Sequence, residues 1–300
     1  MPKLNGQQAT RIIMETIPTP IVIVTGSIVA KNVSESFRMI EAGALAIITK
    51  PPSVNHPDYK KEVRKLTQTL RIMSEVKLVK RLAHTSKEQE AVQSTIEKNI
   101  QTKSDIQLVV IGASTGGPIV LQKILSGLPK NLPVPFLIVQ HISQGFMEGF
   151  VEWLQMTTKF PLHIATQGEY PLPGHGYFAP DNVHMGIETG LKIVLSNHYP
   201  ENGLRPSVAY LFRSVARVIG SGAVGVLLTG MGRDGADELK LMKDNGAVTI
   251  AQDKESSIVH GMPGEAIKLH AAMYILPPDK ITAMLVSLVK KNNMEYIHEQ

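Results

Sequence analysis

Short apolar runs alternate with amphipathic stretches through the C-terminal two thirds of the chain. The apolar runs predict buried strands at residues 107–112, 134–140, 223–229, 247–251 and 273–276. The stretches between them have helical spacing and predict helices at residues 117–127, 144–156, 205–220, 234–245 and 278–291. This alternation is typical of an α/β domain with a mainly parallel sheet and helices on both faces.

A different pattern lies between residues 160 and 200. Two short runs of alternating apolar and polar residues flank Gly190, and glycine accepts the positive φ that tight turns require. This pattern predicts a hairpin that is added to the sheet.

The first 52 residues carry a smaller strand–helix–strand pattern. The runs PIVIVT (20–25) and ALAIITKPP (44–52) predict buried strands, and residues 34–43 have helical spacing. A piece of this size buries too little surface to form a good core by itself.

Polar and charged residues dominate from Ser53 to Asp105. Helical spacing of apolar residues within this region indicates an interdomain linker that is partly helical, and the spacing is seen at Val63, Leu66, Leu70 and Met73. We therefore divide the chain into a small N-terminal domain (1–52), a linker (53–104) and an α/β domain (105–295).

The formal net charge is +5, and the excess is confined to one segment. Between Tyr59 and Lys87, nine Lys or Arg residues stand beside two Glu residues, so this segment carries +7 and the rest of the chain −2. Such a charge run is more often a solvated helix face than a binding patch. We therefore expect no nucleic-acid partner.

The chain contains no cysteine, which excludes disulfides, thiolate metal ligands and a cysteine nucleophile. Its start lacks the charged and apolar regions of a signal peptide. No apolar run approaches the roughly 18 residues of a membrane span. We expect a cytoplasmic protein with no membrane insertion.

The strand expected at 107–112 runs into a G-x-S-x-G motif, Gly112 to Gly116, with a helix expected after it. Ser114 could be a nucleophile on a sharp strand-to-helix turn, a helix cap, or part of a phosphate cradle. The phosphate cradle is disfavoured because the chain has neither G-K-[ST] after the glycines nor a G-x-G-x-x-G order. The motif alone leaves the other two interpretations about equally favoured.

Two further polar residues follow apolar strands. His141 comes directly after the strand at 134–140, and Asp234 follows the strand at 223–229 and a glycine-rich turn. Ligands bind at the carboxyl edge of open α/β sheets, where such residues meet. Singly, His141 could be a loop histidine and Asp234 a helix N-cap, but with Ser114 they predict a nucleophile, a base and an acid.

A rival chain order would use Ser114, then Asp234 or Asp253, and His260. Chain order does not decide the matter, because the same geometry recurs in different orders. His141 is favoured because it follows a strong strand directly, which His260 does not.

The segments IGASTGGP, VQHI, YFAPDNVHM, RPSV, LLTGMGRDGA and AQDKESSIVHGMP closely resemble the chemotaxis protein-glutamate methylesterase family over roughly residues 105–292. The resemblance implies a three-layer αβα catalytic domain that hydrolyses glutamate γ-methyl esters on chemoreceptors and deamidates certain receptor glutamines. It implies Ser114 as nucleophile, His141 as base and Asp234 as acid, and it adds Thr115 and the Met231 turn to the oxyanion environment. It requires no metal or cofactor, and the implied partners are methyl-accepting chemotaxis receptors.

Residues 1–52 resemble the second half of a flavodoxin-like response-regulator receiver domain. Thr25 matches the switch hydroxyl, and Lys50 matches the lysine that contacts the phosphoryl group. The phospho-acceptor aspartate would lie upstream of Met1, for which we favour a late start codon over a real truncation. A chemotaxis histidine kinase is expected as a partner only if a complete receiver exists.

Two alternative functions stay open. A catalytically idle receptor-docking protein would not need Ser114, His141 and Asp234 together. A small-molecule esterase of the α/β-hydrolase kind would need them, and it differs from the first interpretation in its substrate alone.

Overall fold

The computed structural model describes residues 4–26, 30–76 and 105–295. The chain divides into two compact units, the first built on residues up to Lys80 together with Ile142–Trp153, and the second on the remainder. The assignment of residues 53–104 as a linker stays a prediction, because residues 77–104 lie outside the described part.

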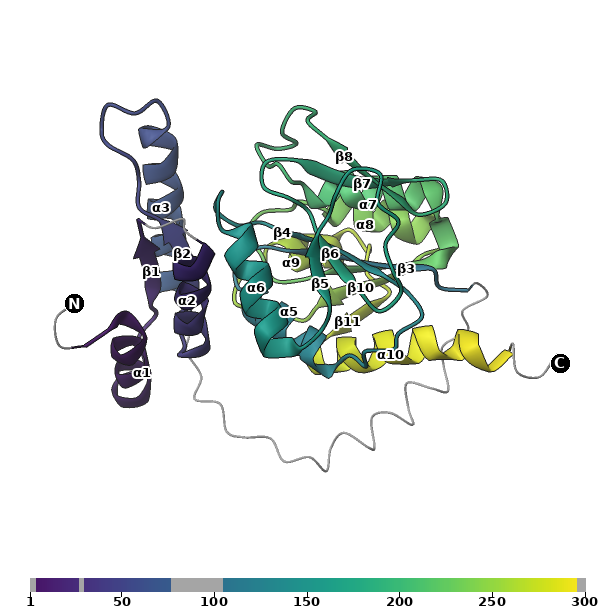
Figure 1. Ribbon diagram of the computed structural model, residues 1–300, viewed down its shortest axis with the longest axis horizontal. Coiled ribbons are helices and arrows are strands. Elements are labelled where there is room, and N and C mark those ends of the chain that lie inside the picture. The colour runs from purple at the N-terminus through teal and green to yellow at the C-terminus, as the bar shows by residue number, and fades with distance from the viewer. Residues whose placement is uncertain (1–3, 27–29, 77–104, 296–300) are drawn as a thin grey trace. The chain divides into compact units, whose positions relative to one another are not determined.

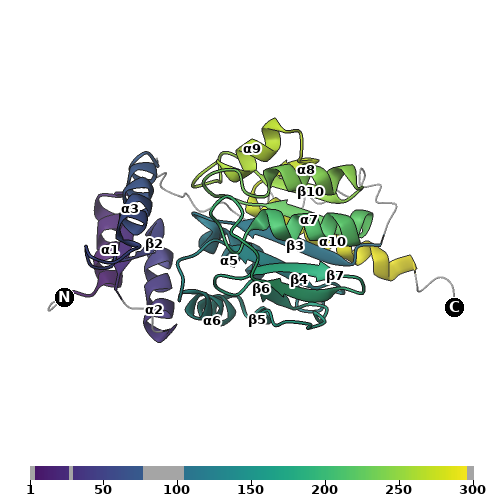
Figure 2. The ribbon, with the colours of Figure 1, turned by 90° about the horizontal axis from the view of Figure 1, so that it is seen from above.

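The second unit is built on a seven-stranded sheet, in the order β11-β10-β9-β3-β4-β6-β5. Every neighbouring pair in it is parallel (Figures 1 and 2). The strands are β3 (Leu108–Ala113), β4 (Phe136–Gln140), β5 (Leu162–Ile164), β6 (Gly176–Phe178), β9 (Ala223–Leu227), β10 (Val248–Gln252) and β11 (Tyr274–Leu276). The five predicted strands are confirmed, whereas β5 and β6 were not predicted.

Helices cover both faces of this sheet, which confirms the predicted α/β architecture. The helices of the second unit are α5 (Gly117–Gly127), α7 (Val208–Val218), α8 (Ala236–Asp244), α9 (Met262–Lys268) and α10 (Pro278–Glu295), with a 3₁₀ turn at Gly220–Gly222. Helix α6 (Met147–Thr158) is divided between the two units after Trp153. Figure 1 shows α7 and α8 on one side of the sheet and α10 on the other. Every residue of β3 and β4 is buried, as expected for strands covered on both faces.

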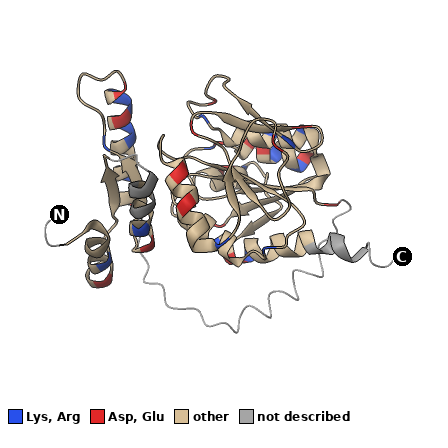
Figure 3. Ribbon diagram, in the orientation of Figure 1, with Lys and Arg blue, Asp and Glu red and all other residues tan. Residues whose placement is uncertain are grey.

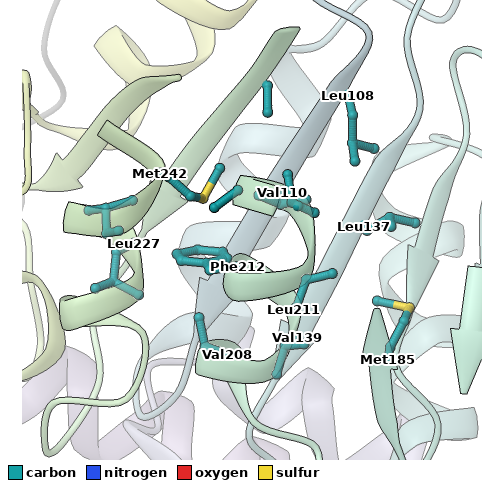
Figure 4. Packing of buried hydrophobic residues seen from close by; sticks show 14 of the residues in the cluster. Leu108, Val110, Leu137, Val139, Met185, Val208, Leu211, Phe212, Leu227 and Met242 are labelled. Carbon is teal, nitrogen blue, oxygen red and sulfur yellow. The ribbon is translucent and has the colours of Figure 1, made fainter. Parts of the chain in front are cut away.

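The core between the sheet and α7 follows from the two-residue period of strands. Alternate strand residues point to one face and meet the apolar face of the helix. Figure 4 shows this packing, with Leu108, Val110, Leu137, Val139 and Leu227 on the strands and Val208, Leu211 and Phe212 on α7.

The hairpin predicted around Gly190 is present, but the expectation that it joins the main sheet is wrong. Strands β7 (His184–Glu188) and β8 (Lys192–Ser196) pair antiparallel and form a sheet of their own. They pack against α7, where the backbone N–H of Ile187 donates to Ser214 Oγ at 3.2 Å. The hairpin therefore buries the face of α7 that the main sheet leaves uncovered.

The first unit contains a two-stranded parallel sheet. Its elements are α1 (Gly6–Thr16), β1 (Val22–Thr25), α2 (Ala30–Glu41), β2 (Ala46–Thr49) and α3 (Tyr59–Ser74). Helix α1 was not predicted; a capping box between Asn5 and Gln8 marks its start. Ile12, Ile17 and Val24 are exposed apolar residues of this unit.

Helix α3 confirms the amphipathic helix expected in the polar region. Figure 3 shows Lys and Arg along it, and the exposed basic residues are Lys60, Lys61, Arg64, Lys65 and Arg71. No helix in the described ranges is both long and apolar enough to cross a bilayer.

The space around Gly112 shows how closely the sheet and α7 approach each other. A Cβ added at Gly112 would lie 2.3 Å from Val208 Cγ1 and 3.1 Å from Leu227 Cδ1. We expect Gly112→Ala to lower the free energy of unfolding by about 1–3 kcal/mol through overpacking. Denaturant unfolding followed by circular dichroism measures this loss.

The control variant is Gly26→Ala, because a Cβ at Gly26 would meet nothing within 4 Å. Equal stability of Gly112→Ala and wild type would contradict this account of the core.

Candidate active site

Ser114, His141 and Asp234 are placed by three adjacent strands. Ser114 follows β3, His141 follows β4 and Asp234 lies in the loop after β9, and the sheet order puts β3 between the other two. The His141 amide donates to the Ala113 carbonyl at 2.9 Å, so the chain leaves β3 and β4 at the same level. The sequence expectation that these residues meet at one sheet edge is confirmed in position.

The turn that carries Ser114 is tight. The Ser114 amide donates to the Thr229 carbonyl at 3.0 Å, and the Gly117 amide donates to the Ser114 carbonyl at 2.8 Å. Gly116 has a φ of +81°, a left-handed conformation that favours glycine. The helix-cap interpretation of Ser114 is wrong, because Gly116 is the N-cap of α5 and no side chain caps that helix.

His141 and Asp234 form a close ion-pair contact. His141 Nε2 lies 2.9 Å from Asp234 Oδ2, and the two side chains are 11% and 2% exposed. The distance is that of a charge-assisted hydrogen bond, although the approach lies off the axis of the ring N–H, which leaves Nε2 without a well-aligned hydrogen bond. The acid is therefore sealed from water and directed at the imidazole.

The Asp234 carboxylate also sits at the N-terminus of α7. Oδ1 accepts from Ser207 Oγ at 2.9 Å and from the Ala209 amide at 3.1 Å, and Oδ2 accepts from the Val208 amide at 2.7 Å. The interpretation of Asp234 as the N-cap of the helix that follows it is wrong, since that cap is Gly235. The carboxylate instead binds free amides of a different helix, where the helix dipole favours a negative charge.

These contacts set the protonation of the carboxyl group. Burial by itself would raise the pKa of Asp234. The His141 contact and the amide hydrogen bonds from Val208 and Ala209 outweigh burial and hold the pKa below its ordinary value. Asp234 is therefore a carboxylate at neutral pH despite its burial.

Comparison with known proteins identifies the family of this site. The CheB methylesterase family model matches residues 109–285, which is more than half of the chain. The chain belongs to the CheB methylesterase family. The matched span contains the three strand-end residues and the loops around them.

Named relatives extend this family match. A protein of Nitrosospira multiformis named protein-glutamate methylesterase/protein-glutamine glutaminase is 55% identical over 96% of this chain and 81% of its own length. A Geobacter metallireducens protein of the same activity name is 52% identical over 96% of this chain and 83% of its own. The crystal structure of the Thermotoga maritima CheB methylesterase catalytic domain is similar, with a TM-score of 0.60 and 38% identity, over 62% of this chain and all of that domain.

The rival residues are not arranged as a second triad. His260 Nδ1 lies 3.3 Å from Ser257 Oγ, and Asp253 Oδ1 accepts from the Ser256 amide. Asp234, the other candidate acid for that order, contacts His141. The geometry therefore favours the order Ser114, His141, Asp234 within this CheB-family domain.

Thr115 and Met231 lie on two loops beside Ser114. A Cβ added at Gly230 would come within 2.7 Å of Ser114 Cβ, which places the Gly230–Met231 turn against the serine. The Thr115 carbonyl accepts from Thr229 Oγ1 at 3.0 Å. Within the described residues, no hydrogen bond uses the amide of Thr115 or of Met231.

Other histidines, and the Thr25 and Lys50 of the receiver resemblance, make contacts away from the three strand-end residues. His184 is fully buried in β7 and stacks on Tyr210, and His175 Nδ1 lies 2.8 Å from His163 Nε2. In the first unit, the amide of Lys50 donates to the Thr25 carbonyl at 2.8 Å, which joins the ends of β2 and β1. Among the described side chains, no cluster of three or more His, Asp or Glu could hold a metal ion.

Sequence reasoning missed Ser207 and Gln140 as parts of the site. Ser207 supports the acid, and Gln140 donates to the Ser114 and His141 carbonyls. The segments RPSV and VQHI drew attention to both residues, but only the tertiary contacts give them a function.

The contacts of Asp234 predict a pH dependence of stability. A carboxyl group with a lowered folded pKa stabilises the protein fully above its ordinary value of 3.8, and this contribution disappears as the pH falls through the folded value. We expect Asp234→Asn to be less stable than wild type at pH 7 and the difference to shrink below about pH 4. Chemical denaturation between pH 3 and pH 7 measures it.

Asp279→Asn is the control, because its ion pair with Lys123 is exposed and should contribute little at any pH. A stability difference for Asp234→Asn that stays constant down to pH 3 would refute the lowered pKa.

Proposed function

We propose that Ser114, His141 and Asp234 form the catalytic triad of a protein-glutamate methylesterase that acts on methyl-accepting chemotaxis receptors. The enzyme class follows from the CheB methylesterase family and from the names of the relatives. The observation that carries the triad is the buried contact between His141 and Asp234 at the sheet edge where Ser114 also lies. No metal or cofactor has a step in this proposal.

The proposed reaction has two halves. Ser114 Oγ attacks the ester carbonyl, and its proton passes to His141. His141 then protonates the departing methoxide, which leaves as methanol with a glutamyl ester on Ser114. Water attacks this acyl-enzyme, and His141 takes one proton of the water and returns it to Ser114 Oγ as the acyl bond breaks. The glutamate side chain is released and loses its remaining proton to solvent.

The orientation of the imidazole assigns a nitrogen to each partner. Because Nε2 faces Asp234, Nδ1 is the nitrogen left to accept the Ser114 proton. The described residues show no hydrogen bond between the Ser114 hydroxyl and this ring, and such bonds often tighten only once substrate is bound. Asp234 stabilises the imidazolium that forms during the attack.

The amides of Thr115 and Met231 supply the proposed oxyanion environment. Both belong to loops beside Ser114, and both are without a hydrogen-bond partner in the part of the chain described. Backbone donors aimed at the developing oxyanion stabilise it without reorganising during the reaction.

Deamidation uses the same groups. A glutamine side chain on a receptor would be attacked by Ser114, and His141 would protonate the departing nitrogen so that ammonia leaves. The acyl-enzyme is then the same as in ester hydrolysis, which fits the paired activities in the names of the relatives.

The first unit carries the regulatory part of the proposal. Thr25 ends β1 and Lys50 directly follows β2, the parallel strand beside it, as expected for a receiver-like phosphoryl site. A chemotaxis histidine kinase is the partner that a complete receiver would require. We also propose that residues 1–52 and 105–295 are separate domains, because the first resemble a receiver and the second contain the match to the CheB methylesterase family.

Triad substitutions test the reaction. We expect Ser114→Ala and His141→Ala to reduce methanol release from methylated receptor membranes by roughly 10³-fold or more, because nucleophile and base act as one unit. His260→Ala should stay near wild type, since His260 contacts Ser257 and not the acid. Circular dichroism checks that each variant is folded.

The same assay separates the alternatives. Loss of activity in His260→Ala with His141→Ala unaffected would move the base to His260. A folded wild type without turnover would favour a receptor-docking protein. Faster hydrolysis of small esters than of receptor esters would favour a small-molecule esterase.

A further inference from the structure

Gln140 links the two reacting residues through their main chains. It is the last residue of β4 and is 1% exposed. Its Nε2 donates to the Ser114 carbonyl at 2.9 Å and to the His141 carbonyl at 2.8 Å. One planar amide group therefore spans the serine turn and the histidine loop.

The chemistry of the two partners fixes how this amide is oriented. Both acceptors are carbonyl oxygens, and only the NH₂ side of a glutamine has two hydrogens to donate. The oxygen side points at Gly117, where an added Cβ would lie 2.1 Å from Gln140 Oε1. Gly117 thus provides the space that lets the amide reach the turn.

The hydrogen bond from Gln140 to the Ser114 carbonyl adds to the main-chain hydrogen bonds that hold Ser114 in place. The Ser114 amide is held by the Thr229 carbonyl on the β9 side. On the β4 side the main-chain ladder ends with the His141 amide and the Ala113 carbonyl, one residue before the serine. Beyond that point, the Gln140 amide is what holds the Ser114 carbonyl to the strand that carries the base.

We infer that Gln140 is a positioning residue, which sets the separation of Ser114 and His141 and so the rate of proton transfer between them. The inference rests on the proposed triad. Gln140 touches main-chain carbonyls and no reacting atom, so its effect must pass through the geometry of the two residues that it joins. A misplacement of about 1 Å between reacting groups can cost roughly 100-fold in rate.

Two substitutions of similar length test this role. Gln140→Met removes both donors, and Gln140→Glu replaces the NH₂ with an oxygen that faces two carbonyl oxygens. With methylated receptor membranes as substrate, we expect kcat for methanol release to fall about 10- to 100-fold in each, and KM to change by less than about threefold. Labelling of Ser114 by a fluorophosphonate should slow in parallel.

Gln140→Glu also has a signature in its pH profile. A buried carboxyl beside carbonyl oxygens has a raised pKa, and its neutral form regains one O–H donor. We therefore expect the ratio of its kcat to the wild-type kcat to rise as the pH falls from about 8 to about 6. The ratio for Gln140→Met should not change with pH, because methionine does not titrate. If Gln140 had a purely structural role, the ratio would be independent of pH in both variants.

Thr249→Val is the matched control, since it removes a buried hydrogen bond, to the Ala271 carbonyl at 2.7 Å, outside the candidate site. We expect Thr249→Val to lose about as much thermal stability as Gln140→Met but to keep a kcat near that of wild type. If Gln140→Met does not fold, the pH profile of Gln140→Glu decides.

The outcomes separate this inference from the proposed function. Turnover that survives Ser114→Ala would overturn the proposed triad. Turnover that requires Ser114 but is unchanged in Gln140→Met, or a flat pH ratio in Gln140→Glu, would overturn the positioning role and leave the triad in place.

Discussion

A buried carboxylate governs the arrangement of this site. Removing the charge of Asp234 from water is costly unless hydrogen bonds and a counter-charge replace its hydration. The start of α7 supplies three donors and the end of β4 supplies the imidazole. The start of α7 and the end of β4 both contact the carboxylate that the turn after β9 carries. These three segments are therefore fixed relative to each other. A Cβ at Gly235 would lie 2.4 Å from Val208 Cγ1, so the glycine after Asp234 permits this approach.

Buried side chains at the strand ends then fasten the loops of the site to one another. Gln252, at the end of β10, accepts from the Thr229 amide at 2.8 Å and donates to the Ser256 carbonyl at 3.0 Å. Thr229 Oγ1 in turn donates to the Thr115 carbonyl. Gln140 makes the corresponding connection on the other side of β3. Groups held this way by rigid strands keep a productive geometry more reliably than free loops would.

The sequence predicted the parts of this arrangement that depend on local pattern. Ser114, His141 and Asp234 could be found because each follows a long apolar strand, and parallel strands put such residues at one edge. Strands β5 and β6 have three residues each, too few for a period to be recognised. The hairpin around Gly190 was recognised from its turn, but its place beside α7 depends on which apolar face was left uncovered. The roles of Ser207 and Gln140 are set by residues far away along the chain, which no local pattern reports.

The burial of Asp234 behind two partly exposed residues favours a catalytic site over a docking surface. Ser114 and His141 are both half-buried, whereas the side chain of Asp234 is only 2% exposed. Only the serine has to be reached by a side chain that extends from another protein, while an acid in water would be screened and would act weakly on the imidazole. Burial of a carboxylate costs free energy of folding and adds no contact area for a partner. A surface that only binds receptors would therefore gain nothing from a buried acid beneath a histidine. In the proposed reaction a positive charge forms on His141, and the buried carboxylate of Asp234 is then already in place to stabilise it.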